Sequence, residues 1–538
     1  MIRRKYTILF LLAALIAAAA FFVSCGSKKT AGPSAPQTNK ILQNPETASA
    51  VRETAVPPSE PTGTPAKTPV AASHTASPGR TPAKTAPRTP TALVQRTTAA
   101  KTAAKTTAPG KTATPAKATP TVTPAPTNPT LNKTYTVDPH TLGLTVDKDG
   151  TMLLAGKPYY GFGVNSFTMA IRYIEGAGRQ MYRDQFEILK KYDIPFVRIN
   201  FGGYWPDYYW NFDYNSETIL RQLRDVVECA EEYNIGLICS LMWYDGAISY
   251  YVGEHRSDMG NPNSATVKYA KNYVATIVKE FKDSPAIWAW EIGNEYNLGA
   301  DLCDPTFRSK LPNGPCTPYA PSGFDFYTSK ELRSFYTEIG NTIRKYDKTR
   351  MITTGDGDMR NASLSLRDAA QKMNPATHLW TEQWTQDTPD DFYKMCAYFT
   401  PDPLNTISFH LQHAQQDGNG RASFLLTLDR FRTKVSTLKY FQEYVTAARL
   451  AKKGLFFGEM GDMMYMEGDK DAINVFRNVT DWIVQAEIQM AATWQFSNND
   501  LKATDSGIDG QKLRILQEKN KNYKKDGKAD TEIYWANK

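Results

Sequence analysis

The stretch Ala286-Ile-Trp-Ala-Trp-Glu-Ile-Gly-Asn-Glu295 decides how the fold is interpreted. It is a short, mostly apolar run that ends in two polar residues, Asn294 and Glu295. Short continuous apolar runs are typical of strands that are buried on both faces of a parallel sheet. A charge at the end of such a run is costly unless it has a partner or a chemical task. The stretch therefore predicts a buried strand that carries a functional glutamate at its carboxyl end.

Similar runs recur seven more times, in alternation with amphipathic stretches. They cover residues 160–167, 196–202, 236–243, 351–356, 406–412, 454–459 and 490–496. Helical periodicity is found at residues 216–233, with Ser216 as N-cap, and at 266–281, 330–346, 435–450, 472–486 and 511–523. Eight strand–helix units predict an α/β fold, the (β/α)8 or TIM barrel. A hairpin over residues 144–154, turning at Asp147-Lys-Asp-Gly150, is expected before the first strand.

In such barrels the active site forms at the carboxyl ends of the strands. Arg198 lies on the second run, His410 on the sixth, Glu459 at the end of the seventh and Trp494 on the eighth. Two carboxylates across a barrel mouth can cleave a glycosidic bond, because one protonates the leaving oxygen and the other attacks the anomeric carbon. We predict Glu295 as the acid/base and Glu459 as the nucleophile, kept ionised by Arg198. The predicted substrate-binding residues are Arg198, Asn294, His410, Trp494, Trp243 and Trp205.

The pattern resembles glycoside hydrolase family 5, a family of the clan A barrels whose acid/base and nucleophile end strands four and seven. The segments that carry the likeness are Trp290-Glu-Ile-Gly-Asn-Glu295, Gly458-Glu459 after Leu455-Phe-Phe, and Thr493-Trp-Gln495. The likeness covers about residues 138–525. It implies a retaining enzyme that cleaves β-1,4-mannan or β-1,4-glucan by double displacement, with Trp494 under the sugar that is attacked.

Two positions depart from the family pattern. The sixth strand reads His410-Leu-Gln412 where members usually carry His-x-Tyr, and the third ends in Met242-Trp-Tyr244 where many cellulases carry a histidine. The missing histidine favours a β-mannanase over a cellulase. Two other functions stay open: a catalytically impaired barrel that binds carbohydrate as a surface lipoprotein, and an exo-acting or transglycosylating relative whose segment 297–329 blocks one end of the cleft.

Aromatic residues are concentrated in the stretch Gly202-Gly-Tyr-Trp-Pro-Asp-Tyr-Tyr-Trp210, which follows the second strand. They either stack on sugar rings near the mouth or pack locally around a long loop. The sequence contains no Gly-x-Ser-x-Gly motif of a serine hydrolase and no metal or nucleotide motif. We therefore expect no cofactor and no metal, a β-linked polysaccharide or oligosaccharide as the substrate, and a monomer.

The amino-terminal quarter of the chain differs in composition from the rest. Arg3-Arg4-Lys5 precedes an apolar run to Val23, and Phe22-Val-Ser-Cys25 resembles a bacterial lipobox. We predict a lipoprotein signal peptide at residues 1–24, a lipidated Cys25, a disordered Thr/Pro/Ala/Lys-rich linker at 25–133 and a catalytic domain at 134–538. The protein would then be extracytoplasmic and anchored to the membrane at the cell surface, or secreted if the lipobox is not used.

The charge of the chain is divided in the same way. Residues 1–133 hold 17 Lys/Arg and three Asp/Glu, a net charge of +14, so the remaining 46 basic and 52 acidic residues give −6. Because the basic excess lies in the leader and the linker, we expect no nucleic-acid partner. Cysteine pairing stays open: Cys303 and Cys316 flank a loop and could form a disulfide. The other cysteines of the predicted domain are Cys229, Cys239 and Cys396.

Overall fold

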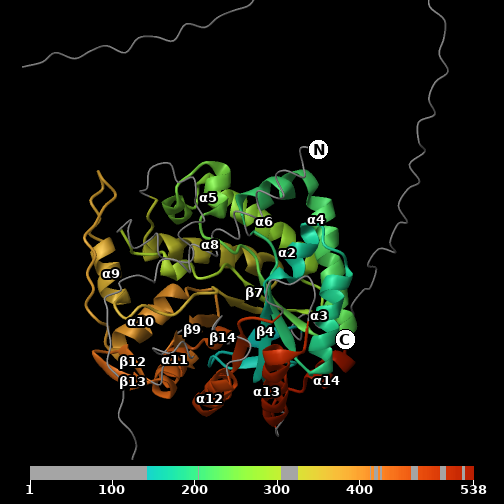
Figure 1. Ribbon diagram of the computed structural model, residues 1–538. Helices are drawn as coiled ribbons and strands as arrows, with labels where there is room; N and C mark the ends of the chain where they lie inside the picture. Colours follow the sequence, from blue (N-terminus) through green and yellow to red (C-terminus); the bar gives the residue numbers. More distant parts are fainter. Residues whose placement is uncertain are drawn as a thin grey trace, which may run out of the picture. The chain divides into compact units, whose positions relative to one another are not determined.

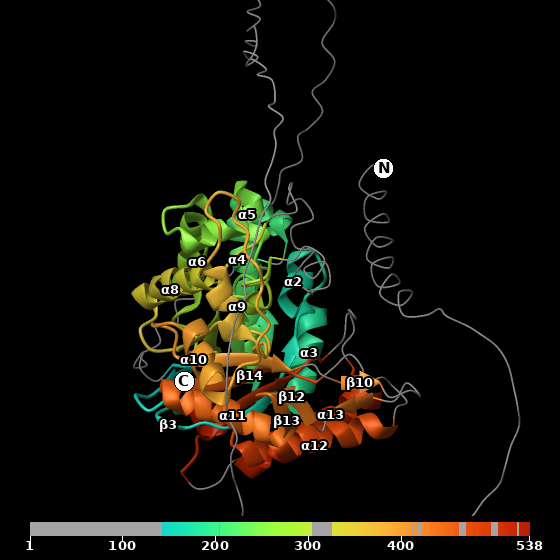
Figure 2. The same cartoon turned by 90° about the vertical axis from the view of Figure 1, so that its left-hand side faces the viewer.

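A computed structural model describes nine segments of the chain: residues 142–203, 205–303, 325–411, 414–416, 422–424, 427–461, 470–496, 504–523 and 527–538. Eight parallel strands close into a barrel in the order β4-β5-β6-β7-β8-β9-β14-β15, and helices surround it (Figure 1, Figure 2). The predicted (β/α)8 barrel is confirmed. The predicted signal peptide and linker lie outside the described residues, as do Cys25, Cys316 and Gln412.

The barrel strands coincide with the eight apolar runs. They are β4 (Gly161–Ser166), β5 (Phe196–Asn200), β6 (Gly236–Ser240), β7 (Ile287–Glu291), β8 (Met351–Thr353), β9 (Thr406–Leu411), β14 (Gly454–Met460) and β15 (Met490–Thr493). Shorter strands form a sheet of β1 (Leu144–Val146), β2 (Met152–Leu154) and β3 (Lys157–Pro158), and the hairpins β10 (Ala414–Gln416) with β11 (Ala422–Phe424) and β12 (Thr427–Arg430) with β13 (Thr433–Ser436).

The helices follow the strands in chain order. They are α2 (Thr168–Ile174), α3 (Gln180–Lys191), α4 (Pro206–Tyr233), α5 (Ala247–Val252), α6 (Ala265–Phe281), α8 (Ser329–Tyr346), α9 (Ser363–Ala370), α10 (Pro389–Phe399), α11 (Thr437–Ala451), α12 (Lys470–Ala486), α13 (Gly507–Tyr523) and α14 (Thr531–Ala536), with the 3-10 turns η2 (Arg256–Gly260) and η3 (Tyr296–Leu298). In the described part of the chain, no helix is both long and apolar enough to cross a membrane.

Local capping explains where several helices begin. Ser264 accepts a hydrogen bond from the N–H of Val267 at the start of α6, and Thr328 and Glu331 form a capping box at α8. The predicted helix at residues 216–233 forms the second segment of α4, but Ser216 is not the N-cap of α4. Helix α4 begins ten residues earlier, at Pro206, because proline favours the first helical position, and a kink at Asn215 divides the helix.

The predicted hairpin is confirmed and closes the amino-terminal end of the barrel. β1 and β2 are antiparallel, and the N–H groups of Asp149 and Thr151 donate to Asp147 Oδ1 at 2.9 and 2.8 Å in the turn. The inner side chains of the sheet join those of the barrel and of α14 in one buried cluster. That cluster contains Leu144, Met152, Leu154, Tyr159, Phe196, Ile238, Trp288, Ala289, Met351, Phe456, Met490, Ala492 and Tyr534.

Trp288 on β7 is the largest side chain of this cluster and is fully buried. Its ring packs edge-on against Tyr159 and Tyr534 at centroid distances of 5.4 and 5.8 Å. We predict that Trp288→Ala lowers the free energy of unfolding by about 3–5 kcal/mol, because it leaves a cavity where the barrel is filled. Urea denaturation followed by far-UV circular dichroism measures this change. Leu450→Ala, at a side chain that is 66% exposed, is the control and should change stability by less than about 0.5 kcal/mol.

Candidate active site

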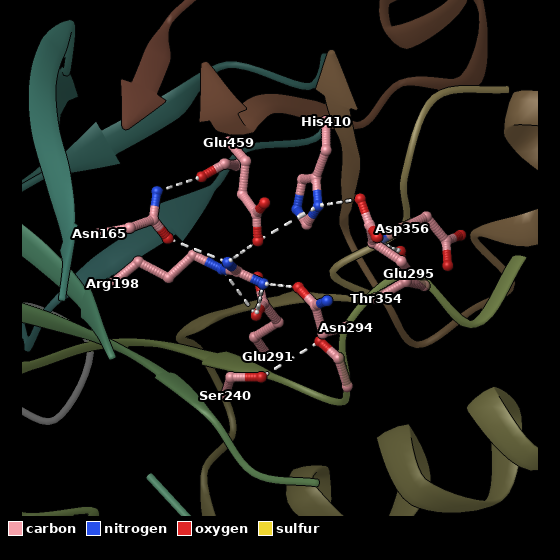
Figure 3. A network of polar contacts seen from close by, with 12 residues as sticks. Asn165, Arg198, Ser240, Glu291, Asn294, Glu295, Thr354, Asp356, His410 and Glu459 are labelled. Atoms are coloured by element: carbon pink, nitrogen blue, oxygen red, sulfur yellow. Dashed lines mark hydrogen bonds and ion pairs between the residues drawn. The ribbon is translucent and has the colours of Figure 1, made fainter. Parts of the chain in front are cut away.

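The site is organised around Arg198, a buried arginine in the middle of β5 (Figure 3). Its Nε donates to both carboxylate oxygens of Glu291, at 2.8 and 3.0 Å, and its Nη2 lies 2.7 Å from Glu291 Oε1. Nη1 donates to Asn165 Oδ1 at 2.9 Å and to Glu459 Oε1 at 2.7 Å. Nη2 also donates to Asn294 Oδ1 at 2.7 Å. Four of the five N–H groups of the guanidinium therefore donate hydrogen bonds, and Nη2 also forms an ion pair with Glu291, so one cation holds two carboxylates and two carboxamides.

Strand register explains why these side chains meet. Asn165 on β4 lies beside Arg198 on β5, and His410 on β9 lies beside Glu459 on β14. An irregularity in the register of β14 directly precedes Glu459. At Gly458, a Cβ atom would lie 2.6 Å from His410 Nε2. The absence of a side chain at Gly458 thus makes room for the imidazole between the strands.

Glu295 follows β7 in a left-handed backbone conformation, with φ 57° and ψ 28°. Such backbone strain is uncommon outside glycine and is concentrated at functional sites. The N–H of Glu295 donates to the carbonyl of Gly355 at 2.7 Å, which fixes the chain there. Burial raises the pKa of the Glu295 carboxyl to about 7, against a smaller lowering by the charge of Arg198. Glu295 therefore keeps a proton near neutral pH, as a general acid must.

Glu459 lies in a different electrostatic environment. Burial also raises its pKa above the ordinary value, but His410 and Arg198 oppose the rise. At Glu459 the guanidinium acts through both its charge and a hydrogen bond, whereas at Glu295 it acts through its charge. The contact with Arg198 therefore favours the ionised form of Glu459. Two carboxyl groups with such unequal surroundings are suited to unequal roles.

His410 lies between the two glutamates (Figure 3). Its Nδ1 is 3.2 Å from Glu295 Oε1 and 3.5 Å from Glu459 Oε1. Burial lowers the pKa of the imidazole to about 4, although the charge of Glu459 acts in the opposite direction. The ring is therefore neutral near pH 7. His410 was predicted to bind substrate. In the structure its nearest polar neighbours are the carboxyl groups of Glu295 and Glu459.

One atom from each of Glu295, His410 and Glu459 lies within 4.8 Å of the other two. By distance alone, such a group could offer three ligands to a divalent metal ion. Among the described residues, no other set of three or more His, Cys, Asp or Glu side chains is grouped in this way. The direct contacts among the three side chains are equally compatible with acid–base catalysis by the two carboxyl groups. That the site works without a metal stays a prediction.

Three aromatic rings adjoin the charged network. Trp243 lies after β6, with its ring 4.9 Å from the guanidinium carbon of Arg198. Phe167 packs edge-on against Trp243 at a centroid distance of 4.8 Å. Trp494, after β15, lies 6.2 Å from Trp243 and 6.4 Å from Phe167. Trp243 is buried, and the other two are half-buried. The structure thus brings the predicted Trp243 and Trp494 together beside the charged residues, with Phe167 added.

Trp205 lies farther out. Its side chain is 38% exposed, and its ring contacts Tyr244 at 5.1 Å. The stretch that follows is helical from Pro206 onward and is not a loop, and Tyr208 and Tyr209 are buried in the core. For those two residues the local-packing interpretation is correct, because their rings contact one another and Tyr273. Tyr204 lies outside the described residues.

Sequence reasoning missed two residues of the network. Glu291 and Asn165 both lie inside apolar runs, where a polar side chain needs a partner. The same criterion that selected Arg198 would have selected them. Glu291 lies within the stretch quoted first, four residues before Glu295, and its carboxylate is fully buried against Arg198.

Comparison with known proteins agrees with this geometry. Residues 156–500, more than half of the 538 residues, match the family described as cellulase, glycosyl hydrolase family 5. The chain belongs to this family. The matched range contains Arg198, Glu295, His410 and Glu459. The resemblance drawn from the sequence is thereby confirmed.

Individual relatives of this family 5 protein are distant. Mannan endo-1,4-beta-mannosidase 1 of Solanum lycopersicum is 21% identical over 317 residues, which cover 54% of this chain and 67% of the relative. A probable mannan endo-1,4-beta-mannosidase A-2 of Aspergillus terreus is 28% identical over 144 residues, 26% of this chain and 30% of that protein. The chain thus spans about two thirds of one relative and under a third of the other. The crystal structure of the endo-1,4-beta-mannanase from Rhizomucor miehei is similar with a TM-score of 0.48 and 16% identity, over 71% of this chain and 99% of that one.

Proposed function

We propose that this family 5 protein is a retaining endo-acting glycoside hydrolase of β-1,4-mannan or β-1,4-glucan, with Glu459 as nucleophile and Glu295 as acid/base. The observation that carries the proposal is the spacing of the pair. One oxygen of each carboxyl group lies within 4.8 Å of the other. Retaining enzymes hold the two groups about 5–5.5 Å apart, whereas inverting enzymes need about 6.5–9.5 Å to admit a water molecule.

The reaction then proceeds in two displacements. Glu459 attacks the anomeric carbon while the bond to the leaving oxygen breaks, and Glu295 gives that oxygen its proton. A glycosyl ester on Glu459 results. Glu295, now a carboxylate, takes a proton from water, which attacks the same carbon and releases Glu459. Arg198 holds the nucleophile in place, and Asn294, held by Arg198 through Oδ1, presents its amide nitrogen to the sugar 2-hydroxyl.

Two observations favour mannan over glucan as the substrate. Trp243, shortly after β6, stands where many cellulase-type members of the family carry a histidine. The two curated relatives compared above are named as mannan endo-1,4-beta-mannosidases. Gln412, which takes the usual place of a tyrosine, lies outside the described residues. The intact pair of Glu295 and Glu459 argues against an impaired barrel that only binds carbohydrate.

We predict that Glu459→Gln abolishes hydrolysis of soluble β-mannan or β-glucan, and that Glu295→Gln lowers it by about 10²–10⁴-fold on polysaccharide. Reducing-sugar release measures both losses. Glu443→Gln, which changes another buried glutamate on α11, should retain most of the activity. Proton NMR of the first product should show the anomeric configuration of the substrate. Inversion, or hydrolysis by Glu459→Gln at the wild-type rate, would contradict the mechanism.

The pH dependence follows from the two carboxyl groups. kcat/KM should fall as pH rises through the pKa of Glu295, about 7, because the acid loses its proton, and should fall as pH drops through the raised pKa of Glu459. Glu291→Gln removes a negative charge that competes for Arg198, so we expect the acidic limb to move to lower pH. Glu291→Asp keeps the charge and is the control. An unmoved acidic limb in Glu291→Gln would show that Glu291 serves packing alone.

We also propose that the protein is a surface lipoprotein, cleaved before Cys25 and tethered through residues 25–133. Support comes from the charged, apolar and small-residue order of the leader and from Phe22-Val-Ser-Cys25. Cells that are given labelled palmitate should incorporate the label into the wild-type protein and not into Cys25→Ser. Cys303→Ser, a matched change in the barrel domain, should be labelled normally. Equal labelling of Cys25→Ser would refute the anchor.

A further inference from the structure

An exposed aromatic surface lies at the start of α4, outside the charged network. It consists of Trp205, Trp210 and Tyr214, whose exposed fractions are 38%, 41% and 84%, and we call it the rim face. Seven large hydrophobic side chains are exposed in the described part of the chain, and three of them fall within these ten residues. Such a concentration of exposed apolar surface is typical of a binding site.

The topology puts the rim face at the catalytic end of the barrel. Helix α4 follows β5, so its first turns lie near the carboxyl end of that strand, where the active sites of such barrels form. The kink at Asn215 separates these first turns from the rest of the helix. Figure 1 shows α4 along the outside of the barrel, and Trp210 at its start contacts α5. The rim face therefore belongs to the wall of the mouth.

The two sides of this first segment have separate tasks. Tyr208, Tyr209 and Phe212 face inward and are buried, and all three pack on Tyr273 of α6. The opposite side carries Trp210 and Tyr214, which are four residues apart and thus neighbours on one helix face, about 6 Å apart along the axis. The buried side anchors the segment, so it is held rigidly while its outer rings stay accessible.

Aromatic contacts connect the rim face to the active site. The ring of Trp205 contacts Tyr244 at 5.1 Å, and Tyr244 follows Trp243, whose ring lies beside Arg198. Farther along the rim, Trp210 packs edge-on against Tyr250 and Tyr251 of α5, at 6.3 and 5.3 Å. Aromatic rings therefore occur at intervals between the charged network and the exposed surface of the rim face.

The charge and the aromatic content of the rim face indicate which class of ligand it can bind. Residues 205–220 include Asp207, Asp213 and Glu217 and contain no lysine or arginine. That charge disfavours nucleic acid and anionic lipid. Exposed Trp and Tyr alternate with exposed carboxylates and amides, among them Asn211. Flat rings with polar neighbours suit a sugar polymer, whose rings have apolar faces and hydroxyl edges.

We propose that the rim face binds a segment of a neutral β-linked polysaccharide that extends beyond the catalytic pair. This inference rests on the proposed function, because it takes the polymer held by the rim face to be the one that is cleaved. The rim face would keep a long chain on the enzyme without contacting the bond that is broken.

Affinity electrophoresis of the full chain through gels that contain soluble β-mannan or β-glucan tests the proposal. It is run in the Glu459→Gln background, so that the polymer is not degraded. Tyr214→Ala and Trp210→Ala should each weaken retardation by about two- to tenfold, the range expected for the loss of one aromatic contact. Trp384→Ala removes another exposed tryptophan, 46% exposed and located between α9 and α10, and should leave retardation unchanged. Circular dichroism melting curves check folding.

The outcomes separate this proposal from the catalytic one. With Glu459 intact, Tyr214→Ala should raise KM on the polysaccharide more than on a short oligosaccharide that occupies only the catalytic centre. Unchanged retardation and unchanged KM for a folded Tyr214→Ala would overturn the rim face. Weaker retardation in a protein whose wild type hydrolyses neither polymer would support the rim face as a binding surface and refute the enzyme.

Discussion

The active site depends on one buried cation shared between two buried carboxylates. Taking a charge out of water is costly, and Arg198 is tolerated on β5 because it forms hydrogen bonds and ion pairs with two carboxylates and two carboxamides. Arg198 forms ion pairs with both Glu291 and Glu459. Burial raises the pKa of the neighbouring Glu295 to about 7, and the charge of Arg198 opposes this rise only in part. The ion pair with Arg198 therefore favours the ionised form of Glu459, whereas burial favours the protonated form of Glu295.

The scaffold keeps this balance in place. The charged and polar groups of the network come from β4, β5, β7, β9 and β14 of a closed barrel, with Glu291, Asn294 and Glu295 all on or just after β7. The side chains from different strands cannot separate without opening the sheet. Gly458 leaves space for His410 between the carboxyl groups, and Glu295, with its left-handed backbone, places its carboxyl group beside the same imidazole. The hairpin and α14 close the opposite end with apolar side chains, so that the polar groups are confined to the carboxyl end.

The type and the exposure of the side chains at the barrel mouth change with distance from this network. Charged groups lie deepest, the rings of Phe167, Trp243 and Trp494 adjoin them, and the exposed rings at the start of α4 lie farthest out. Reaction chemistry needs low dielectric and fixed dipoles, which the buried layer provides. The proposed recognition of a long polymer needs accessible surface, and the outer rings are exposed.

The sequence by itself determined the barrel, because eight apolar runs with helical periods between them leave few ways to bury every run. It also selected Glu295 and Glu459, since each ends such a run. It mispredicted the start of α4, because the aromatic stretch around Pro206 was interpreted as a loop. Only the tertiary structure decided that the two carboxyl groups lie within 4.8 Å of each other, that Glu291 shares Arg198 with Glu459, and that His410 lies between the pair. The physical reason is that periodicity reports burial along one strand, whereas distance, pKa and shared charge depend on the closure of the barrel and on the register between strands, which a single strand does not encode.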